Sequence, residues 1–591
     1  MKFAVLASVA IGMLAAHAGS VVKVTGSEGA YQLTFNGKPY WIAGAGGGAD
    51  KALLRKMGGN SFRTWGAGNI EKELADAKAN GLTVMCGFWL GHAEHGFNYR
   101  NATALENTRQ EVLGIVRRVK DHPNLLCWAL GNEMEMNNPN RREMWEFIDR
   151  LAAEVKAIDP NHPVTTVIAE LPKNNTDDIA KYIHNLDFIG INSYGGCPSL
   201  GERWRKAGMT LPYVVTEFGA RGSWEGARDD RGTPIEETST EKGVTFENSY
   251  RKGILAEKGK LCLGSYGFTW GWKVESTATW HGMLLPDNSI LASARTMQRL
   301  WGKTKVWNRP PEVSHIRVSA NHGSKDDVIT ASIEAKDPDG DPLRYNWVLV
   351  SDTGDYDTIG LGLPMPEGWA KAIVGGQGTN AIELRLPGGG VYQLYCYVFD
   401  GKGDAAYANL PMHGEGPAPK RELKPVPVPY PVYKDGQTVK KWYPSGYMGN
   451  TGALKVDEAC KVNPHAGDNC LKVEYNAKDN WAGIYWQDPP NDWGDRAGGA
   501  NLSKASMLVF WARGEKGGEK VNFWMGGLKG KKYGDTAKAA REVTLSKEWK
   551  RYRIPLDNLD LSCIKSGFGF NLGGQGEPFA FYLDDIEYIE E

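Results

Sequence analysis

The chain has 591 residues, of which 41% are hydrophobic and 24% charged, and its formal net charge is -1. This length is too great for a single core and predicts about three domains of ordinary globular composition. A net charge near zero carries no signature of a nucleic-acid or membrane-surface partner. The 21 tryptophans are unusual, because so many large flat rings favour either aromatic cores or surfaces that stack on carbohydrate.

Residues 1–18 are typical of a signal peptide, with Lys2, an apolar run over 3–16 and the small-residue cleavage site Ala16-His17-Ala18. The run is shorter than the ~20 residues that span a bilayer, which disfavours a membrane anchor. We therefore expect a secreted or periplasmic protein with no membrane, nucleic-acid or protein partner.

Residues 19–308 are predicted to form a (β/α)8 TIM barrel. Eight short apolar runs alternate there with longer amphipathic segments such as 69–81, 104–122 and 141–159. The eight runs are 40–46, 60–65, 82–89, 125–133, 163–170, 186–194, 212–219 and 262–270. An open doubly wound sheet is the alternative, and the even spacing and the lack of a glycine-rich phosphate loop count against it.

The remainder of the chain is predicted to be all-β. Alternating strand patterns over 309–412 indicate an immunoglobulin-like β-sandwich, which we expect to serve as a spacer. A proline-rich linker follows at 413–431, and residues 432–591 are predicted to form a β jelly-roll of the kind that carries carbohydrate-binding modules.

Two glutamates end runs that face each other across the predicted barrel mouth. Glu133 ends the fourth run, directly after Asn132, and Glu217 ends the seventh. Side chains at the carboxyl ends of barrel strands converge on one face. Glycoside hydrolysis needs one carboxylic acid and one carboxylate flanking the bond, and Asn132 would donate to the 2-hydroxyl of the sugar. A salt bridge or a helix cap is the alternative role for each glutamate.

The motifs "WALGNE" and "VVTEFG" resemble those of clan A glycoside hydrolases, whose acid/base follows an Asn on strand four and whose nucleophile ends strand seven. "LTFNGKPYWIAGAGG" and "GGNSFRTWG" are similar to the barrel of glycoside hydrolase family 2. The resemblance covers about residues 30–305. It implies a retaining mechanism with Glu133 as acid/base and Glu217 as nucleophile.

The same resemblance implies roles for further residues at the barrel mouth. Arg63 is expected to hydrogen-bond the nucleophile, Tyr194 to donate to it, and Trp270 to form a platform under the sugar. Further candidate substrate-binding residues at strand ends and in loops are Trp65, Trp89, His92, Asn192 and Trp280. Glu135, Glu170 and Glu275 are expected to have no direct chemical role.

We expect no cofactor for catalysis. The final "FYLDDIEY" resembles the last strand of carbohydrate-binding modules, which implies a structural calcium ion near Asp584 and Asp585, whereas "DPDGDP" at 337–342 favours a turn. Cys460 and Cys470 either pair in a disulfide or remain thiols.

The overall prediction is a secreted retaining β-glycosidase acting on a β-linked polysaccharide. An endo-β-glucanase with β-1,3-glucan as substrate is favoured, because a barrel followed by an immunoglobulin-like domain resembles bacterial endo-β-1,3-glucanases and glucan-remodelling enzymes. A β-glucan transglycosidase, an exo-β-glycosidase and a non-catalytic glycan-binding protein are the alternatives.

Overall fold

The computed structural model describes residues 19–591, except 28, 355, 357–362, 364, 420–422, 439–441 and 532. The predicted signal peptide, 1–18, lies outside the described residues. The chain divides into two compact units, one ending at Pro417 and one beginning at Ala418.

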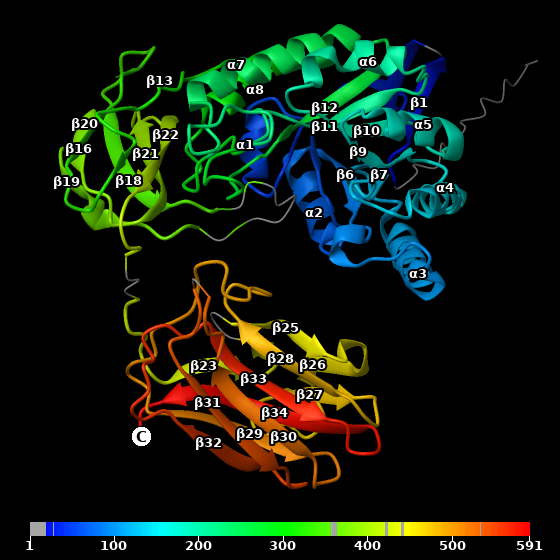
Figure 1. Ribbon diagram of the computed structural model, residues 1–591. Helices are drawn as coiled ribbons and strands as arrows, with labels where there is room; N and C mark the ends of the chain where they lie inside the picture. The colour runs from blue at the N-terminus through cyan, green and yellow to red at the C-terminus, as the bar shows by residue number, and fades with distance from the viewer. Residues whose placement is uncertain are drawn as a thin grey trace, which may run out of the picture. The chain divides into compact units, whose positions relative to one another are not determined.

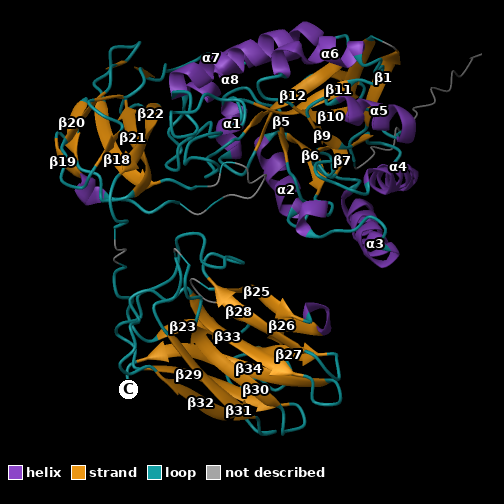
Figure 2. Ribbon diagram, in the orientation of Figure 1, coloured by secondary structure: helices purple, strands orange, loops and turns teal. Residues whose placement is uncertain are grey.

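A closed parallel barrel dominates the first unit (Figures 1 and 2). The strands, in barrel order, are β4 (Ile42–Gly46), β5 (Ser61–Arg63), β6 (Thr83–Phe88), β7 (Leu125–Leu130), β8 (Val164–Thr165), β9 (Val167–Ala169), β10 (Ile189–Asn192), β11 (Tyr213–Phe218) and β12 (Cys262–Phe268). β8 and β9 are two pieces of the fifth position, since β8 pairs with β7 and β9 with β10. β12 pairs with β4 and closes the ring. The predicted fold class is confirmed.

Helices surround this ring in the described part of the chain. They are α1 (Lys51–Lys56), α2 (Ile70–Asn80), α3 (Ala102–Val119), α4 (Arg141–Ile158), α5 (Lys173–Tyr182), α6 (Leu200–Lys206), α7 (Ser239–Ser249) and α8 (Ala292–Trp301). In α4, Met144, Ile148, Leu151 and Val155 recur at three- and four-residue intervals and are all buried, so one apolar face packs on the strands. No helix among the described residues is long and apolar enough to cross a bilayer.

A small antiparallel sheet covers the end of the barrel opposite the strands' carboxyl ends. It consists of β1 (Val22–Ser27), β2 (Ala30–Phe35) and β3 (Lys38–Tyr40). Val22 and Leu33 from this sheet share a buried cluster with the barrel residues Ile42 and Leu126. The sequence patterns did not predict this sheet.

An immunoglobulin-like sandwich completes the first unit. One four-stranded sheet contains β14 (Arg317–Val318), β16 (Ile329–Ser332), β20 (Ala381–Leu384) and β19 (Ile373–Gly375). The other contains β15 (His322–Gly323), β22 (Ala405–Gly414), β21 (Gly390–Phe399) and β18 (Arg344–Ser351), and β13 (Glu312–Val313) pairs with β17 (Ala335–Lys336). Trp347 is fully buried in the core between the sheets.

A buried polar network joins this sandwich to the barrel loops. The Lys242 ammonium on α7 donates to Glu236 at 2.5 Å and to the hydroxyl of Tyr407 on β22 at 2.8 Å. Asn409 on the same strand also donates to Glu236, and Tyr407 contacts the carbonyl oxygen of Thr279 in the loop after β12. Sandwich side chains therefore hold two loops of the barrel mouth, a contact that the predicted spacer role did not include.

The second unit is a jelly-roll of two antiparallel sheets. The larger contains β23 (Tyr430–Lys434), β24 (Gln437–Thr438), β26 (Leu454–Cys460), β27 (Cys470–Tyr475), β29 (Met507–Gly514), β32 (Lys550–Pro555) and β34 (Phe579–Ile589). The other contains β25 (Tyr443–Gly449), β28 (Trp481–Gln487), β30 (Lys520–Gly526), β31 (Lys538–Thr544) and β33 (Ser566–Gly573). Phe523, Phe568 and Phe581 fill the space between them, whereas Tyr443 and Trp481 are about half exposed.

Candidate active site

Glu133 and Glu217 lie at the carboxyl ends of their strands, where TIM barrels build active sites. Glu217 is the next-to-last residue of β11, and Glu133 follows β7 by three residues. Glu133 adopts a left-handed backbone with φ 56°, and its N–H donates to the carbonyl oxygen of Val167 at 2.8 Å. Left-handed backbone is strained for a residue with a side chain, and such strain is concentrated at functional sites.

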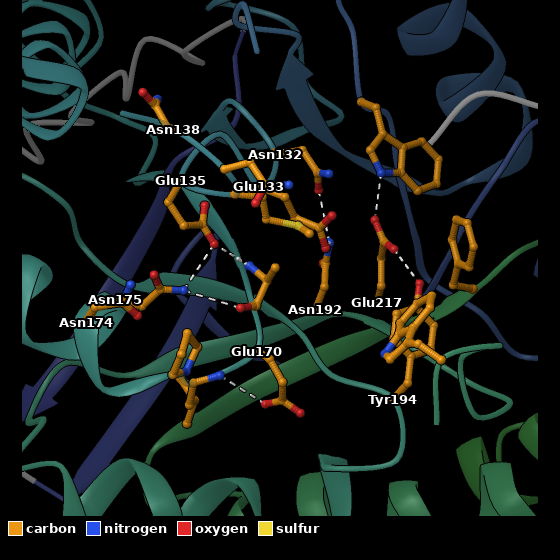
Figure 3. A pocket seen from close by; sticks show the side chains of 18 of the residues that line it. Asn132, Glu133, Glu135, Asn138, Glu170, Asn174, Asn175, Asn192, Tyr194 and Glu217 are labelled. Atoms are coloured by element: carbon orange, nitrogen blue, oxygen red, sulfur yellow. Dashed lines mark hydrogen bonds between the residues drawn. The ribbon is translucent and has the colours of Figure 1, made fainter. Parts of the chain in front are cut away.

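Three side chains donate hydrogen bonds to Glu217. Trp65 Nε1 and Arg63 Nη1 reach Oε1 at 2.7 and 2.9 Å, and the Tyr194 hydroxyl reaches Oε2 at 2.6 Å. Figure 3 shows the hydrogen bond between Tyr194 and Glu217. Both oxygens are therefore fixed in direction by donors from the ends of two strands, Arg63 and Trp65 from β5 and Tyr194 from β10.

Glu133 is connected to the same network through two asparagines. Asn192 Nδ2 donates to Glu133 Oε1 at 2.7 Å and to Asn132 Oδ1 at 3.1 Å. Arg63 Nη2 donates to the same Asn132 oxygen at 2.6 Å. One guanidinium thus links the two glutamates, since it bonds Glu217 directly and Glu133 through the amides.

The environment of Glu133 favours its protonated form. Burial, followed by the nearby negative charge of Glu217, raises the pKa of Glu133 from 4.5 to about 8. Desolvation and a like charge both disfavour a second carboxylate at the same site. The arrangement can therefore present one acid and one carboxylate to a substrate near neutral pH.

A cavity of about 1190 Å³ opens over these residues. It exceeds the roughly 300–1,000 Å³ of typical small-molecule sites, so it has room for more than one sugar ring. Of the predicted site residues, Trp65, Trp89, Asn132, Glu133, Asn192, Tyr194 and Glu217 line it. Arg63 lies beneath, 2% exposed, and reaches the cavity only through its bonds to Glu217 and Asn132.

Besides Arg63, three predicted site residues do not line the cavity. Trp270 is 1% exposed and its indole nitrogen donates to the carbonyl oxygen of Asp50, while that of Trp280 donates to the carbonyl oxygen of Arg221. His92 lies against the ring of Trp89, with ring centroids 4.8 Å apart. These rings pack the loops. The expected platform at Trp270 is therefore wrong in position, and the aromatic residue of β12 that lines the cavity is Phe268, the last residue of that strand.

Sequence reasoning missed several polar residues of the cavity, among them Lys273, Arg203 and Asn175. Lys273 and Glu275 pair at 2.5 Å, and Arg203 pairs with Glu170 at 2.9 Å. Asn175, at the start of α5, also lines the wall. No strand pattern marks these positions, because they lie in loops or on the first turn of a helix.

The second unit contains the two features expected from the sequence to hold a calcium ion near Asp584 and, as one alternative, a disulfide between Cys460 and Cys470. The buried Asp584 carboxylate accepts hydrogen bonds from the backbone N–H groups of His465, Ala466 and Asp585, which account for it without a cation. No group of three or more potential metal ligands occurs among the described residues. Cys460 and Cys470 lie opposite each other on β26 and β27 as free thiols.

Two family models match separate parts of the chain. Residues 48–230 match the TIM barrel domain of glycosyl hydrolases family 2, and residues 429–590 match carbohydrate binding domain 30. The predicted resemblance to a family 2 barrel followed by a carbohydrate-binding module is confirmed.

Several curated and solved proteins that are similar to this chain are β-glucuronidases. That of Canis lupus familiaris is 30% identical over 263 residues, covering 38% of this chain and 36% of the relative. That of Bacteroides fragilis is 27% identical over 192 residues, covering 29% and 25%. A solved β-D-glucuronidase of Dictyoglomus thermophilum is 20% identical with a TM-score of 0.38, covering 48% of this chain and 54% of that chain. This chain spans between about a quarter and just over a third of the length of these curated relatives, from 26% to 36% for two of them.

Proposed function

We propose, from the premise that the barrel is a glycoside hydrolase family 2 TIM barrel domain, that this chain is a retaining β-glycosidase of clan A. The observation that carries the proposal is the pair formed by Glu217, held by three donors, and Glu133, kept protonated beside it. Retaining hydrolysis requires this combination of a carboxylate nucleophile and an acid. A non-catalytic glycan-binding barrel would have no need of it.

In the first step Glu217 attacks the anomeric carbon while Glu133 gives its proton to the departing oxygen, leaving a covalent glycosyl-enzyme. In the second step Glu133 takes a proton from the acceptor, whose oxygen displaces Glu217. Arg63, Trp65 and Tyr194 orient the nucleophile. Asn132 uses Oδ1 in both of its hydrogen bonds within the described chain, so its amide N–H₂ suits a sugar hydroxyl. These steps use protein side chains alone, and we propose no cofactor for catalysis.

The charges of the cavity favour a neutral glycan. Every cation that lines it among the described residues already pairs with a carboxylate, Arg141 with Asp178, Arg203 with Glu170 and Lys273 with Glu275. The acidic lining residues are Glu133, Glu135, Glu170, Glu217, Glu225 and Glu275. A uronic acid would place another carboxylate in this field without a free cation to bind it.

A polymer suits both the cavity and the second unit. The large cavity accommodates several sugar residues, and a carbohydrate-binding domain raises the local concentration of substrate at the barrel. We therefore propose an endo-β-glucanase, exported by residues 1–18. The preference for β-1,3-glucan rests on the resemblance of the domain layout to endo-β-1,3-glucanases.

A second candidate is a β-glucuronidase, favoured by the names of the relatives. The test is a panel of β-1,3-, β-1,4- and mixed-linkage glucans, mannan, galactan and agarose, with 4-nitrophenyl β-glucoside and β-glucuronide as small substrates. Release of glucan oligosaccharides by the wild type, but not by Glu217→Gln, supports the proposal. Cleavage of the glucuronide alone would show that the substrate is a glucuronide and not a glucan. Equal activity of the wild type and Glu217→Gln would show that Glu217 is not the nucleophile.

A further inference from the structure

The cavity continues well past Glu133, away from Glu217. In Figure 3, Glu135, Asn174 and Asn175 lie on the opposite side of Glu133 from Glu217. The walls there come from the loop between β7 and α4, and from the loop before α5 together with the first turn of that helix. This part of the cavity has no part in the chemistry described so far.

Of the two carboxyl oxygens of Glu135, Oε1 is hydrogen-bonded to other described residues and Oε2 is not. Oε1 accepts the backbone N–H of Ala169 at 2.7 Å and the Asn175 side-chain amide at 3.1 Å. Oε2 is buried and has no hydrogen-bond partner in the described chain, although the residue is only 3% exposed and lines the cavity. An unmet buried acceptor is costly, so a water molecule or a ligand hydroxyl that reached this oxygen would gain a full hydrogen bond.

The neighbours of Glu135 fix the direction of its carboxyl group. Asn175 is 1% exposed, and its oxygen accepts from Arg141 Nη2 at 2.8 Å. Arg141 also donates to the carbonyl oxygen of Glu135 at 2.9 Å and pairs with Asp178. The group is therefore preorganised, as a binding residue should be.

The reaction geometry tells which part of a glycan would lie here. In a displacement at the anomeric carbon, the leaving group departs on the side opposite the attacking Glu217, toward the acid Glu133. A sugar attached to the departing oxygen therefore extends beyond Glu133, to the wall that carries Glu135.

We infer that Glu135, held by Asn175 and Arg141, forms an acceptor subsite whose Oε2 binds a hydroxyl of the sugar on the leaving-group side. The inference rests on the proposed function and deepens it. In the return step, the same subsite would hold an incoming sugar while its hydroxyl oxygen bonds to the anomeric carbon, the bond to Glu217 breaks, and the hydroxyl proton passes to Glu133.

The charge state of Glu135 is compatible with this role. Burial raises the pKa of Glu135 to about 7. Near neutral pH much of Glu135 is ionised, and its free oxygen can accept a hydrogen bond from a sugar hydroxyl. An amide N–H₂ in the same place cannot accept one.

The test compares two substrates that share the sugar cleaved in the panel, an aryl glycoside and an oligosaccharide. Glu135→Gln retains an oxygen for Ala169 and replaces Oε2 by an amide. We expect kcat/KM for the oligosaccharide to fall about ten-fold or more, since hydrogen bonds to charged groups are the stronger ones. The value for the aryl glycoside stays within about two-fold, and with added oligosaccharide acceptor the ratio of transfer to hydrolysis falls in parallel.

Two further variants complete the design, each measured at its own pH optimum. Asn174→Ala alters an exposed residue of the same wall and should cause a smaller loss with the same selectivity. Glu111→Gln on the exposed side of α3 removes the same charge far from the cavity and should change neither substrate. The subsite would be overturned if Glu135→Gln and Asn174→Ala both lowered kcat/KM equally for the two substrates. It would also be overturned if neither variant lowered kcat/KM for either substrate. A wild type that cleaves no glycoside would instead overturn the proposed function, and the subsite with it.

Discussion

The pKa of Glu133 gives a quantitative prediction for the pH dependence of activity. A rise from 4.5 to about 8 corresponds to about 5 kcal/mol in favour of the protonated form. At pH 7 about 90% of Glu133 is then protonated, against about 0.3% at the ordinary value. The raised pKa therefore increases the population of the working acid about 300-fold.

Because the acid must be protonated, activity should fall as pH rises through about 8. The profile of kcat/KM against pH reports the free enzyme, and it should be about 100-fold lower at pH 10 than at pH 7. The measurement uses an aryl glycoside with a poor leaving group, and a return to pH 7 checks that the protein has remained folded.

Glu133→Gln is the matched variant, because an amide occupies the same space and does not titrate. It should lose about 10²- to 10⁴-fold on the poor leaving group and retain activity on a 2,4-dinitrophenyl glycoside without the alkaline limb. Glu135→Gln should still lose activity at alkaline pH. This result would show that the fall arises from Glu133 and not from Glu135, the other buried carboxyl group. A limb with a midpoint near 4.5, or one that persists in Glu133→Gln, would refute the reasoning.

Two other variants test the supporting structure. Tyr407→Phe removes a hydroxyl that contacts Lys242, Glu236 and Thr279 in the buried network between sandwich and barrel; it should destabilise the first unit by about 1–3 kcal/mol, seen as a lower Tm. Tyr443→Phe, at a tyrosine 48% exposed, should leave Tm unchanged, and an equal drop in both would argue against the network. Trp481→Ala removes a ring 49% exposed on the carbohydrate-binding domain; pull-down with insoluble glucan should show weaker binding, while turnover of a soluble oligosaccharide stays the same. Unchanged retention on the polymer would exclude this ring from the binding surface.

The barrel was predictable because parallel barrel strands are buried on both faces and form continuous apolar runs. All eight predicted runs contain a barrel strand, and the fifth is broken into β8 and β9 at Thr166. Glu133 and Glu217 could be singled out because a strand's carboxyl end has a known place in such a barrel. The small sheet β1–β3 was missed because its short strands are partly exposed and carry no strong pattern.

The loops were the harder part, because ring direction depends on tertiary contacts. Trp270 lies only two residues past Phe268, yet its indole is turned to Asp50 and Phe268 takes the place at the cavity. The contact of Lys242 with Tyr407 joins residues 165 positions apart. The free oxygen of Glu135 depends on Asn175 and Arg141, whose positions no local pattern could give.

The most direct test of the central claim is to trap the covalent intermediate. A 2-deoxy-2-fluoro glycoside of the cleaved sugar, with a good leaving group, slows the second step because the fluorine destabilises its oxocarbenium-like transition state. Mass spectrometry of the digested protein should find one glycosyl group, on the carboxyl of Glu217. A label on Glu133, Glu135 or Glu170, or a protein that turns the reagent over with inversion and carries no label, would contradict the mechanism.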